Sequence, residues 1–283
     1  MQIIERLDPL RSAVIAMRCD GPLALVPTMG ALHDGHLTLV REAKARAAHV
    51  AVSIFVNPRQ FGAGEDLAAY PRPRTRDLDL LRGEGVSLVW APEAAEMYPA
   101  GYATNISVSG ISEGLCGTAR PGHFDGVATV VCKLFNQVLP DIALFGEKDW
   151  QQLAVIRRMT RDLDLTQPQV GNILGVPTLR EADGLAMSSR NAYLTSEERA
   201  RAAALPRAMR EAIAALGAGA EVAQSLERLS QAVLAAGFTA VDYARLCDAE
   251  TLAPLAARGS GPARLLVAAR IGKARLIDNM AAA

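Results

Sequence analysis

Short apolar runs alternate with helical patterns through the first 175 residues of this 283-residue chain, and this alternation is the strongest constraint on its fold. Repeated strand–helix alternation favours a parallel sheet covered by helices on both faces, because parallel strands need crossover connections. We therefore expect an α/β domain over residues 1–175, with a Rossmann-like, doubly wound parallel sheet. The expected strands are Leu23–Val26, His49–Val56, Ser87–Trp90, Ile142–Phe145 and Val170–Val176, and the expected helices are His36–Ala47, Thr75–Arg82, Asp125–Val138 and Asp149–Arg161.

The pattern changes after about residue 176. Thr195 and Glu198 have the spacing of a capping box, and an Ala-rich helical stretch follows, with a new helix expected at Pro206. One further helix, Val222–Ala236, precedes three strand-like runs at Val241–Cys247, Ala263–Ile271 and Ala274–Ile277. We expect residues 176–283 to form a smaller α+β domain of helices and a short antiparallel sheet, acting as a lid.

The balance of charge restricts the partners of this chain. Lys and Arg together number 30, as do Asp and Glu, which argues against nucleic acid or an anionic membrane as a partner. No stretch approaches the roughly 20 apolar residues that cross a bilayer. Four scattered cysteines without a CxxC pair are typical of reduced thiols, so we expect a cytoplasmic protein.

Two histidines lie where the first strand is expected to become a helix, in the segment PTMGALHDGH. His33 and His36 can face the same side of that helix, and Gly30 and Gly35 allow the backbone to approach a ligand. A helix N-terminus also offers free N–H groups and partial positive charge, so this segment suits a phosphate chain. The alternative is that the histidines lie at a helix start by chance. A protein metal site is not expected, because no nearby Cys or His offers a third ligand.

Polar residues follow a second expected strand. Asn57 and Gln60 come just after HVAVSIFV and are suited to holding hydroxyls or carboxylates by directional hydrogen bonds. Asn57 precedes a proline, so a simple turn explains it equally well, whereas a turn does not explain Gln60.

Two later segments also carry candidate anion-binding groups. In IALFGEKD, Lys148 can meet a phosphate as a point charge, while Asp149 could equally be an ordinary helix cap. Ser188, Ser189 and Arg190 follow an Asp-Gly turn and offer two hydroxyls and a guanidinium, or else form a polar loop before the next helix.

Three of these segments directly follow strands of the same expected sheet. The carboxyl ends of parallel strands lie along one edge, so we expect the three segments to converge there. The sequence therefore predicts a nucleotide bound across these strand ends.

Five segments in this order resemble the pantoate–β-alanine ligase family, whose members are also called pantothenate synthetases: PTMGALHDGH, VSIFVNPRQF, RPGHFDGVATVV, FGEKDWQQL and DGLAMSSRN. HxGH alone is shared by a wide nucleotidyltransferase superfamily, whereas the full set is far more specific. The resemblance covers essentially the whole chain.

The resemblance implies roles for individual residues. It implies catalytic functions for His33, His36, Lys148 and Arg190, with His36 as proton donor, and binding of pantoate by Gln60 and Gln152. Gln60 would also lie near β-alanine, and we place Asn57 with these substrate-binding residues. The implied ATP contacts are Met29, Gly30, Ala31, Leu32, His33, Asp34, Gly35, His36, Gly146, Glu147, Lys148, Asp149, Leu179, Met187, Ser188, Ser189 and Arg190.

The resemblance also implies the reaction. Pantoate and β-alanine would be condensed with ATP to give pantothenate, AMP and pyrophosphate through a pantoyl-adenylate, in coenzyme A biosynthesis. Mg²⁺ accompanies ATP in this family, and the assembly is expected to be a homodimer. Three alternatives are a nucleotidyltransferase that stops after the first step, a nucleotide-binding sensor without catalysis, and a dinucleotide oxidoreductase. The oxidoreductase is disfavoured because no GxGxxG follows the first strand.

Overall fold

The computed structural model describes residues 1–282, and they divide into two compact units. The first comprises Met1–Glu147 and Val155–Pro177, and the second comprises Lys148–Ala154 and the chain from Thr178 onward. The sequence pattern gives no sign that a short segment inside the expected first domain, residues 1–175, belongs with the C-terminal unit. Helix α7 (Trp150–Asp162) therefore begins in the second unit and ends in the first.

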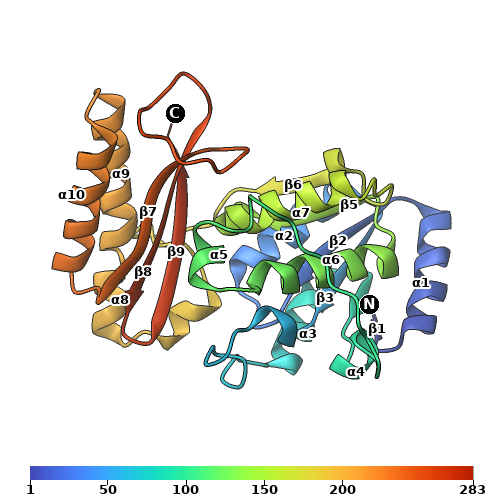
Figure 1. The fold of residues 1–283 in the computed structure, drawn as a ribbon. Coiled ribbons are helices and arrows are strands. Elements are labelled where there is room, and N and C mark those ends of the chain that lie inside the picture. The colour runs from blue at the N-terminus through green and yellow to red at the C-terminus, as the bar shows by residue number, and fades with distance from the viewer. Residues whose placement is uncertain (283) are drawn as a thin grey trace. The chain divides into compact units, whose positions relative to one another are not determined.

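A six-stranded parallel sheet forms the centre of the first unit, in the order β1-β4-β3-β2-β5-β6 (Figure 1). Its strands are β1 (Gln2–Ile4), β2 (Leu23–Thr28), β3 (His49–Ile54), β4 (Leu88–Trp90), β5 (Ile142–Gly146) and β6 (Ile173–Val176). The order reverses at β2, which lies between β3 and β5. This is the doubly wound topology expected from the sequence, and a ligand crevice in such sheets lies outside the carboxyl ends of the strands.

Helices cover both faces of this sheet. Leu37, Val40 and Leu81 of α2 and α3 pack with Val26 and Val52 in one apolar cluster, while Phe135 of α6 packs against Phe145 on the other face. The helices are α1 (Leu7–Asp20), α2 (Asp34–Lys44), α3 (Arg74–Gly83), α4 (Ala94–Met97), α5 (Cys116–Ala119) and α6 (His123–Val138), together with the first-unit part of α7.

Several features of the first unit differ from the sequence-based expectation: the short helices α4 and α5 were not expected, α6 begins at His123 instead of Asp125, and β3 ends at Ile54 instead of Val56. Strand β1 and helix α1 were not expected, because β1 has only three residues and pairs at the sheet edge with β4. Helix α2 begins at Asp34, two residues before the expected start at His36. The expected strand start at Val170 is wrong: Val170–Asn172 is a 3₁₀ turn, since Gly171 and Asn172 favour turns over strands.

The second unit has its own core between helices and a three-stranded antiparallel sheet. Figure 1 shows α9 (Ala204–Gly217) and α10 (Val222–Ala235) against β7 (Ala240–Asp248), β8 (Ala263–Ile271) and β9 (Ala274–Ala281). Thr195 forms the expected capping box at the start of α8 (Ser196–Ala202), and Pro206 lies in the first turn of α9. Among residues 1–282, no helix is long and apolar enough to span a bilayer.

Candidate active site

The two histidines of PTMGALHDGH form a capping box at the start of α2. The Nδ1 atom of His33 accepts a hydrogen bond from the backbone N–H of Gly35 at 3.2 Å, and Nδ1 of His36 accepts from the backbone N–H of His33 at 3.3 Å. The two ring centroids are 4.1 Å apart. The sequence analysis did not identify this capping arrangement, because capping boxes usually carry Ser or Thr and Glu or Gln.

These hydrogen bonds decide which ring nitrogen carries the proton. A ring nitrogen that accepts a hydrogen bond is unprotonated, so each neutral imidazole holds its proton on Nε2. His33 and His36 therefore present two N–H donors at a helix N-terminus, where the helix dipole also favours an anion. This arrangement can stabilise negative charge on phosphate oxygens.

A buried carboxylate holds the loop that leads into α2. Asp77, on α3, accepts hydrogen bonds from the backbone N–H groups of Ala31 and Leu32 at 2.8 and 2.9 Å, and its side chain is almost fully buried. Gly30 adopts a positive φ of 82°, and a Cβ there would lie 3.0 Å from Asp77 Oδ2. The sequence analysis missed Asp77, because nothing in RPRTRDLDL indicates that its carboxylate is directed at this loop.

Gln60 lies in a buried amide cluster after β3. Its Oε1 accepts from Nδ2 of Asn57 at 3.0 Å, and its Nε2 donates to the sulfur of Met29 at 3.1 Å. The hydroxyl of Tyr98 donates to Oδ1 of Asn57 at 2.8 Å, which fixes the orientation of that amide. Burial raises the pKa of Tyr98, so its hydroxyl remains a donor. The segments after β2 and β3 thus meet, as the sequence analysis expected.

The backbone of Gln60 has a second set of supports. Nδ1 of His123 lies 2.8 Å from the carbonyl oxygen of Gln60, and the guanidinium of Arg120 donates to the same oxygen at 3.3 Å. Arg120 also forms an ion pair with Glu65 at 2.6 Å, and this hydrogen bond lowers the pKa of Glu65 despite partial burial. Sequence reasoning missed these residues, although His123 lies within RPGHFDGVATVV.

Lys148, Asp149 and Gln152 belong to the second unit. The strand before them, β5, pairs in parallel with β2, and Gly146 is its last residue. Lys148 Nζ lies 3.7 Å from Oδ1 of Asp149, and Gln152 is half-buried at the start of α7.

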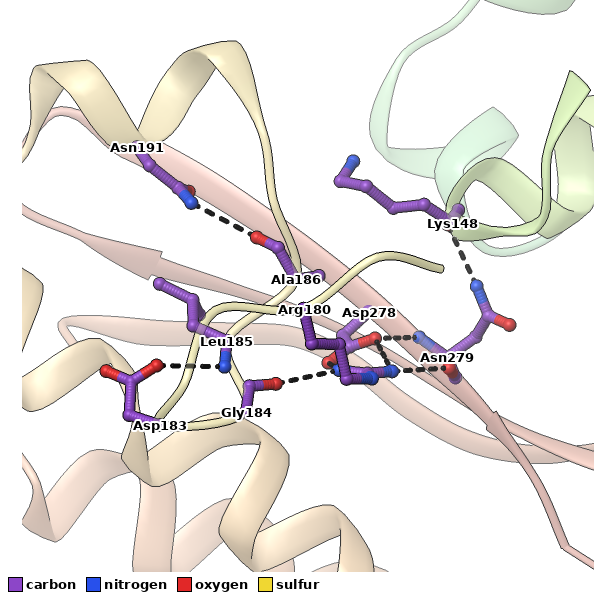
Figure 2. A network of polar contacts seen from close by, with 9 residues as sticks. All are labelled: Lys148, Arg180, Asp183, Gly184, Leu185, Ala186, Asn191, Asp278 and Asn279. Carbon is purple, nitrogen blue, oxygen red and sulfur yellow. Dashed lines mark hydrogen bonds and ion pairs between the residues drawn. The ribbon is translucent and has the colours of Figure 1, made fainter. Parts of the chain in front are cut away.

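The remaining predicted ATP contacts of the second unit lie on a small hairpin and on the short 3₁₀ helix that follows it. The backbone N–H of Met187 donates to the carbonyl of Leu179 at 3.0 Å, and Arg180 and Ala186 form an antiparallel bridge between them. Ser188 then caps the short 3₁₀ helix Ser189–Tyr193 by accepting from the backbone of Arg190 at 3.3 Å. Figure 2 shows this hairpin beside β9, with Asn279 donating to the backbone carbonyl of Lys148.

The structure thus brings the predicted residues together in two sets. His33, His36, Asn57 and Gln60 lie with Met29–Leu32 in the first unit, at the carboxyl ends of adjacent parallel strands. The second unit holds the other set, which comprises Lys148, Asp149, Gln152, Leu179, Met187, Ser188, Ser189 and Arg190. Within residues 1–282, no group of three or more His, Cys, Asp or Glu side chains is placed to hold a metal ion.

Known proteins resemble this chain along its whole length. The family model described as pantoate-beta-alanine ligase matches residues 2–281. The pantothenate synthetase of Novosphingobium aromaticivorans is 69% identical over 281 residues, covering 99% of this chain and 98% of the relative. The pantothenate synthetase of Sphingopyxis alaskensis is 59% identical over 281 residues, covering 99% of each chain.

Solved structures show the same fold. The crystal structure of pantothenate synthetase from Thermus thermophilus has a TM-score of 0.92 at 47% identity, covering 100% of this chain and 99% of that one. A pantoate-beta-alanine ligase from Francisella tularensis, complexed with beta-gamma ATP and beta-alanine, has a TM-score of 0.84 at 32% identity, covering 100% and 98%.

Proposed function

We propose a two-step reaction for this chain, which belongs to the pantoate-beta-alanine ligase family and is an ATP-dependent ligase of pantoate and β-alanine. In the first step, an oxygen of the pantoate carboxylate attacks the α-phosphorus of ATP. Pyrophosphate leaves, and a pantoyl-adenylate forms. In the second step, the amine of β-alanine attacks the acyl carbon, loses its proton, and expels AMP to give pantothenate.

The pair of backbone hydrogen bonds to the two histidine Nδ1 atoms is the observation that carries this proposal. Both Nδ1 atoms accept backbone hydrogen bonds, so each ring carries its proton on Nε2, the nitrogen that can donate to a phosphate oxygen. Negative charge on these oxygens grows as the α-phosphorus is attacked, and fixed donors stabilise it without reorganising. We assign His36 as the proton donor and His33 as its neighbour in the phosphate site. Loss of one such donor costs about 3–4 kcal/mol in the barrier.

We also assign cationic groups of the second unit to ATP. Lys148 and Arg190 carry positive charge that can offset the charge of the triphosphate, and Ser188 and Ser189 offer hydroxyl donors. The backbones of Leu179 and Met187 lie on the same hairpin and complete this part of the proposed ATP site. Gly146, Glu147 and Asp149, which flank Lys148, are assigned to ATP as well.

The amide residues are assigned to pantoate. Gln60 and Gln152 would hold its hydroxyl and carboxylate oxygens, with Gln60 also close to the β-alanine amine. Asn57 supports this assignment, because it orients the Gln60 side chain through its own amide group. Such positioning converts a reaction between separate molecules into one within a single complex.

We propose that magnesium enters as part of the substrate, bound to the phosphates of ATP. The acidic side chain that holds the HxGH loop, Asp77, uses both carboxylate oxygens to accept backbone N–H groups. Mg²⁺ typically keeps several waters and binds substrate phosphates rather than a cage of protein ligands. ATP supplied as its magnesium complex should therefore be the form that supports turnover.

Isotope transfer tests the two-step reaction. Pantoate labelled with ¹⁸O in its carboxylate, supplied with ATP and β-alanine, should yield AMP that carries one ¹⁸O per turnover. Formation of pantothenate together with AMP that carries no ¹⁸O would contradict a pantoyl-adenylate intermediate. Release of pyrophosphate without amide formation would instead indicate a nucleotidyltransferase, and ATP binding without pyrophosphate release would indicate a sensor.

We also propose the cellular compartment of the reaction and the assembly of the enzyme. Free cysteines at all four positions suit a reducing compartment such as the cytoplasm, where pantothenate would serve coenzyme A biosynthesis. We propose a homodimer, the commonest assembly among soluble oligomers, and light scattering of the purified chain tests it. The predicted lid role of the C-terminal domain, residues 176–283, requires compaction in solution scattering when ATP and pantoate are added.

A further inference from the structure

The second unit contains a buried ion pair that the proposed reaction does not use. Nη1 and Nη2 of Arg180 donate to Oδ2 and Oδ1 of Asp278 at 2.7 and 2.9 Å, which is a bidentate pair. The Asp278 side chain is 1% exposed and the Arg180 side chain 24% exposed. Such a pair is costly to bury, and replacing both residues by well-packed apolar residues is often tolerated. A contribution to stability is therefore a weak explanation for its presence.

Arg180 also fixes the tip of the hairpin that carries Leu179 and Met187. Nη1 donates to the carbonyl oxygen of Gly184 at 3.0 Å, and Nη2 donates to that of Asn279 at 3.3 Å. One guanidinium therefore joins the hairpin turn to strand β9, as Figure 2 shows.

The same network reaches Lys148 through the neighbouring residue of β9. Oδ1 of Asp278 accepts from the backbone N–H of Asn279 at 2.7 Å, and Nδ2 of Asn279 donates to the carbonyl oxygen of Lys148 at 2.8 Å. Lys148 and Arg180 are far apart in sequence, yet both form hydrogen bonds with two adjacent residues of one strand. The network fixes the backbone positions from which Lys148 and the hairpin residues extend.

We propose that Arg180, Asp278 and Asn279 are positioning residues, which hold the backbones of Lys148 and the hairpin Leu179–Met187 at fixed positions relative to each other. This inference rests on the proposed function, in which Lys148 and the residues after the hairpin bind the triphosphate. Donors must lie within a fraction of an ångström of their place to stabilise the charge that develops at the phosphorus. The network therefore affects the rate of adenylate formation without contacting the reacting atoms.

Asn279→Ala tests the link to Lys148 while leaving the ion pair intact. We expect kcat for pyrophosphate formation to fall about tenfold, with KM for ATP changed less than about threefold. If Asn279 acts through Lys148, the same substitution should lower kcat less than about twofold in a Lys148→Met background. A full tenfold loss in that background would contradict the proposal, as would wild-type kcat in Asn279→Ala.

Asp278→Asn tests the ion pair, and Asp242→Asn is its matched control. Asp242 likewise forms ion pairs with arginine, accepting from Arg270 and Arg275 at 2.9 and 2.6 Å, but it lies outside the network. We expect Asp278→Asn to lower kcat about ten- to a hundredfold and Asp242→Asn to leave kcat within about twofold, when kcat is measured at a temperature at which both variants are fully folded. Equal losses in both variants would show that the ion pair is only structural. An inactive wild-type chain would instead overturn the proposed function itself.

Discussion

In the proposed site the two ring nitrogens of His36 have different tasks, and two substitutions test this division. The amide of Asn can replace Nδ1, which caps α2, but it does not reach the place of Nε2. We expect His36→Asn to keep the free energy of unfolding within about 0.5 kcal/mol and to lower kcat by about two to three decades. His36→Gln should keep more activity at similar stability, because its longer amide reaches the place of Nε2 and Gln is also an ordinary residue at this position of a capping box. Equal kcat in both variants, measured as pyrophosphate release, would contradict this division.

Asp77 gives a second test at the level of one side chain. Asp77→Asn replaces one acceptor oxygen with an N–H₂ group that faces a backbone N–H donor. We expect a loss of about 1–3 kcal/mol in the free energy of unfolding, because a buried donor is left unpaired. KM for ATP should rise as the Ala31–Leu32 backbone moves. Denaturant unfolding and steady-state kinetics check this, and an unchanged KM would contradict the assigned role of the carboxylate.

Single residues show where sequence reasoning stops. His33, His36 and Gln60 could be selected from sequence because each follows a recognisable strand and lies in a short motif. Asp77, Tyr98 and Asp278 could not, because their partners are 46, 41 and 98 residues away, respectively. A hydrogen bond between distant backbone and side-chain groups depends on how helices pack, and local patterns carry no information on that.

Helix α6 and the 3₁₀ turn η1 (Pro58–Gln60) approach each other so closely that only glycine fits between them. A Cβ on Gly126 would lie 2.3 Å from the carbonyl oxygen of Arg59. We expect Gly126→Ala to cost about 1–3 kcal/mol of stability and to raise KM for pantoate at least about tenfold, because the shift disturbs Asn57 and Gln60. Gly83→Ala, at the end of α3 with no neighbour within 4 Å, is the matched control and should leave both quantities unchanged or improve stability.

The elements themselves were largely predictable. Strands β2, β3 and β5 are continuous apolar runs, as buried parallel strands are, so their positions follow from composition and length. The capping box at Thr195 and the proline in the first turn of α9 also have local causes. Element ends were less predictable: α2 starts at Asp34 because two histidines cap it, and β6 starts late because Gly171 and Asn172 form a turn.

At the scale of the whole molecule, both units contain a carboxylate whose pKa is held low by an arginine. The hydrogen bond from Arg120 lowers the pKa of Glu65 in the first unit, and that from Arg199 lowers the pKa of Asp183 in the second. A pKa lower in the folded than in the unfolded state stabilises the fold at neutral pH. That contribution begins to fade as the pH falls below the ordinary carboxylate pKa of about 4 and is lost below the folded-state value.

The pH dependence of unfolding tests this linkage in each unit. We expect Glu65→Gln to lower the free energy of unfolding at pH 7 by about 1 kcal/mol, since a partly exposed charge-assisted bond is lost. Between pH 7 and pH 3 the variant should lose less stability than the wild-type chain, because one linked proton is gone. Asp183→Asn should behave in the same direction. Urea unfolding at several pH values measures these slopes, and a Glu65→Gln slope equal to that of the wild type would show that this ion pair contributes nothing to acid sensitivity.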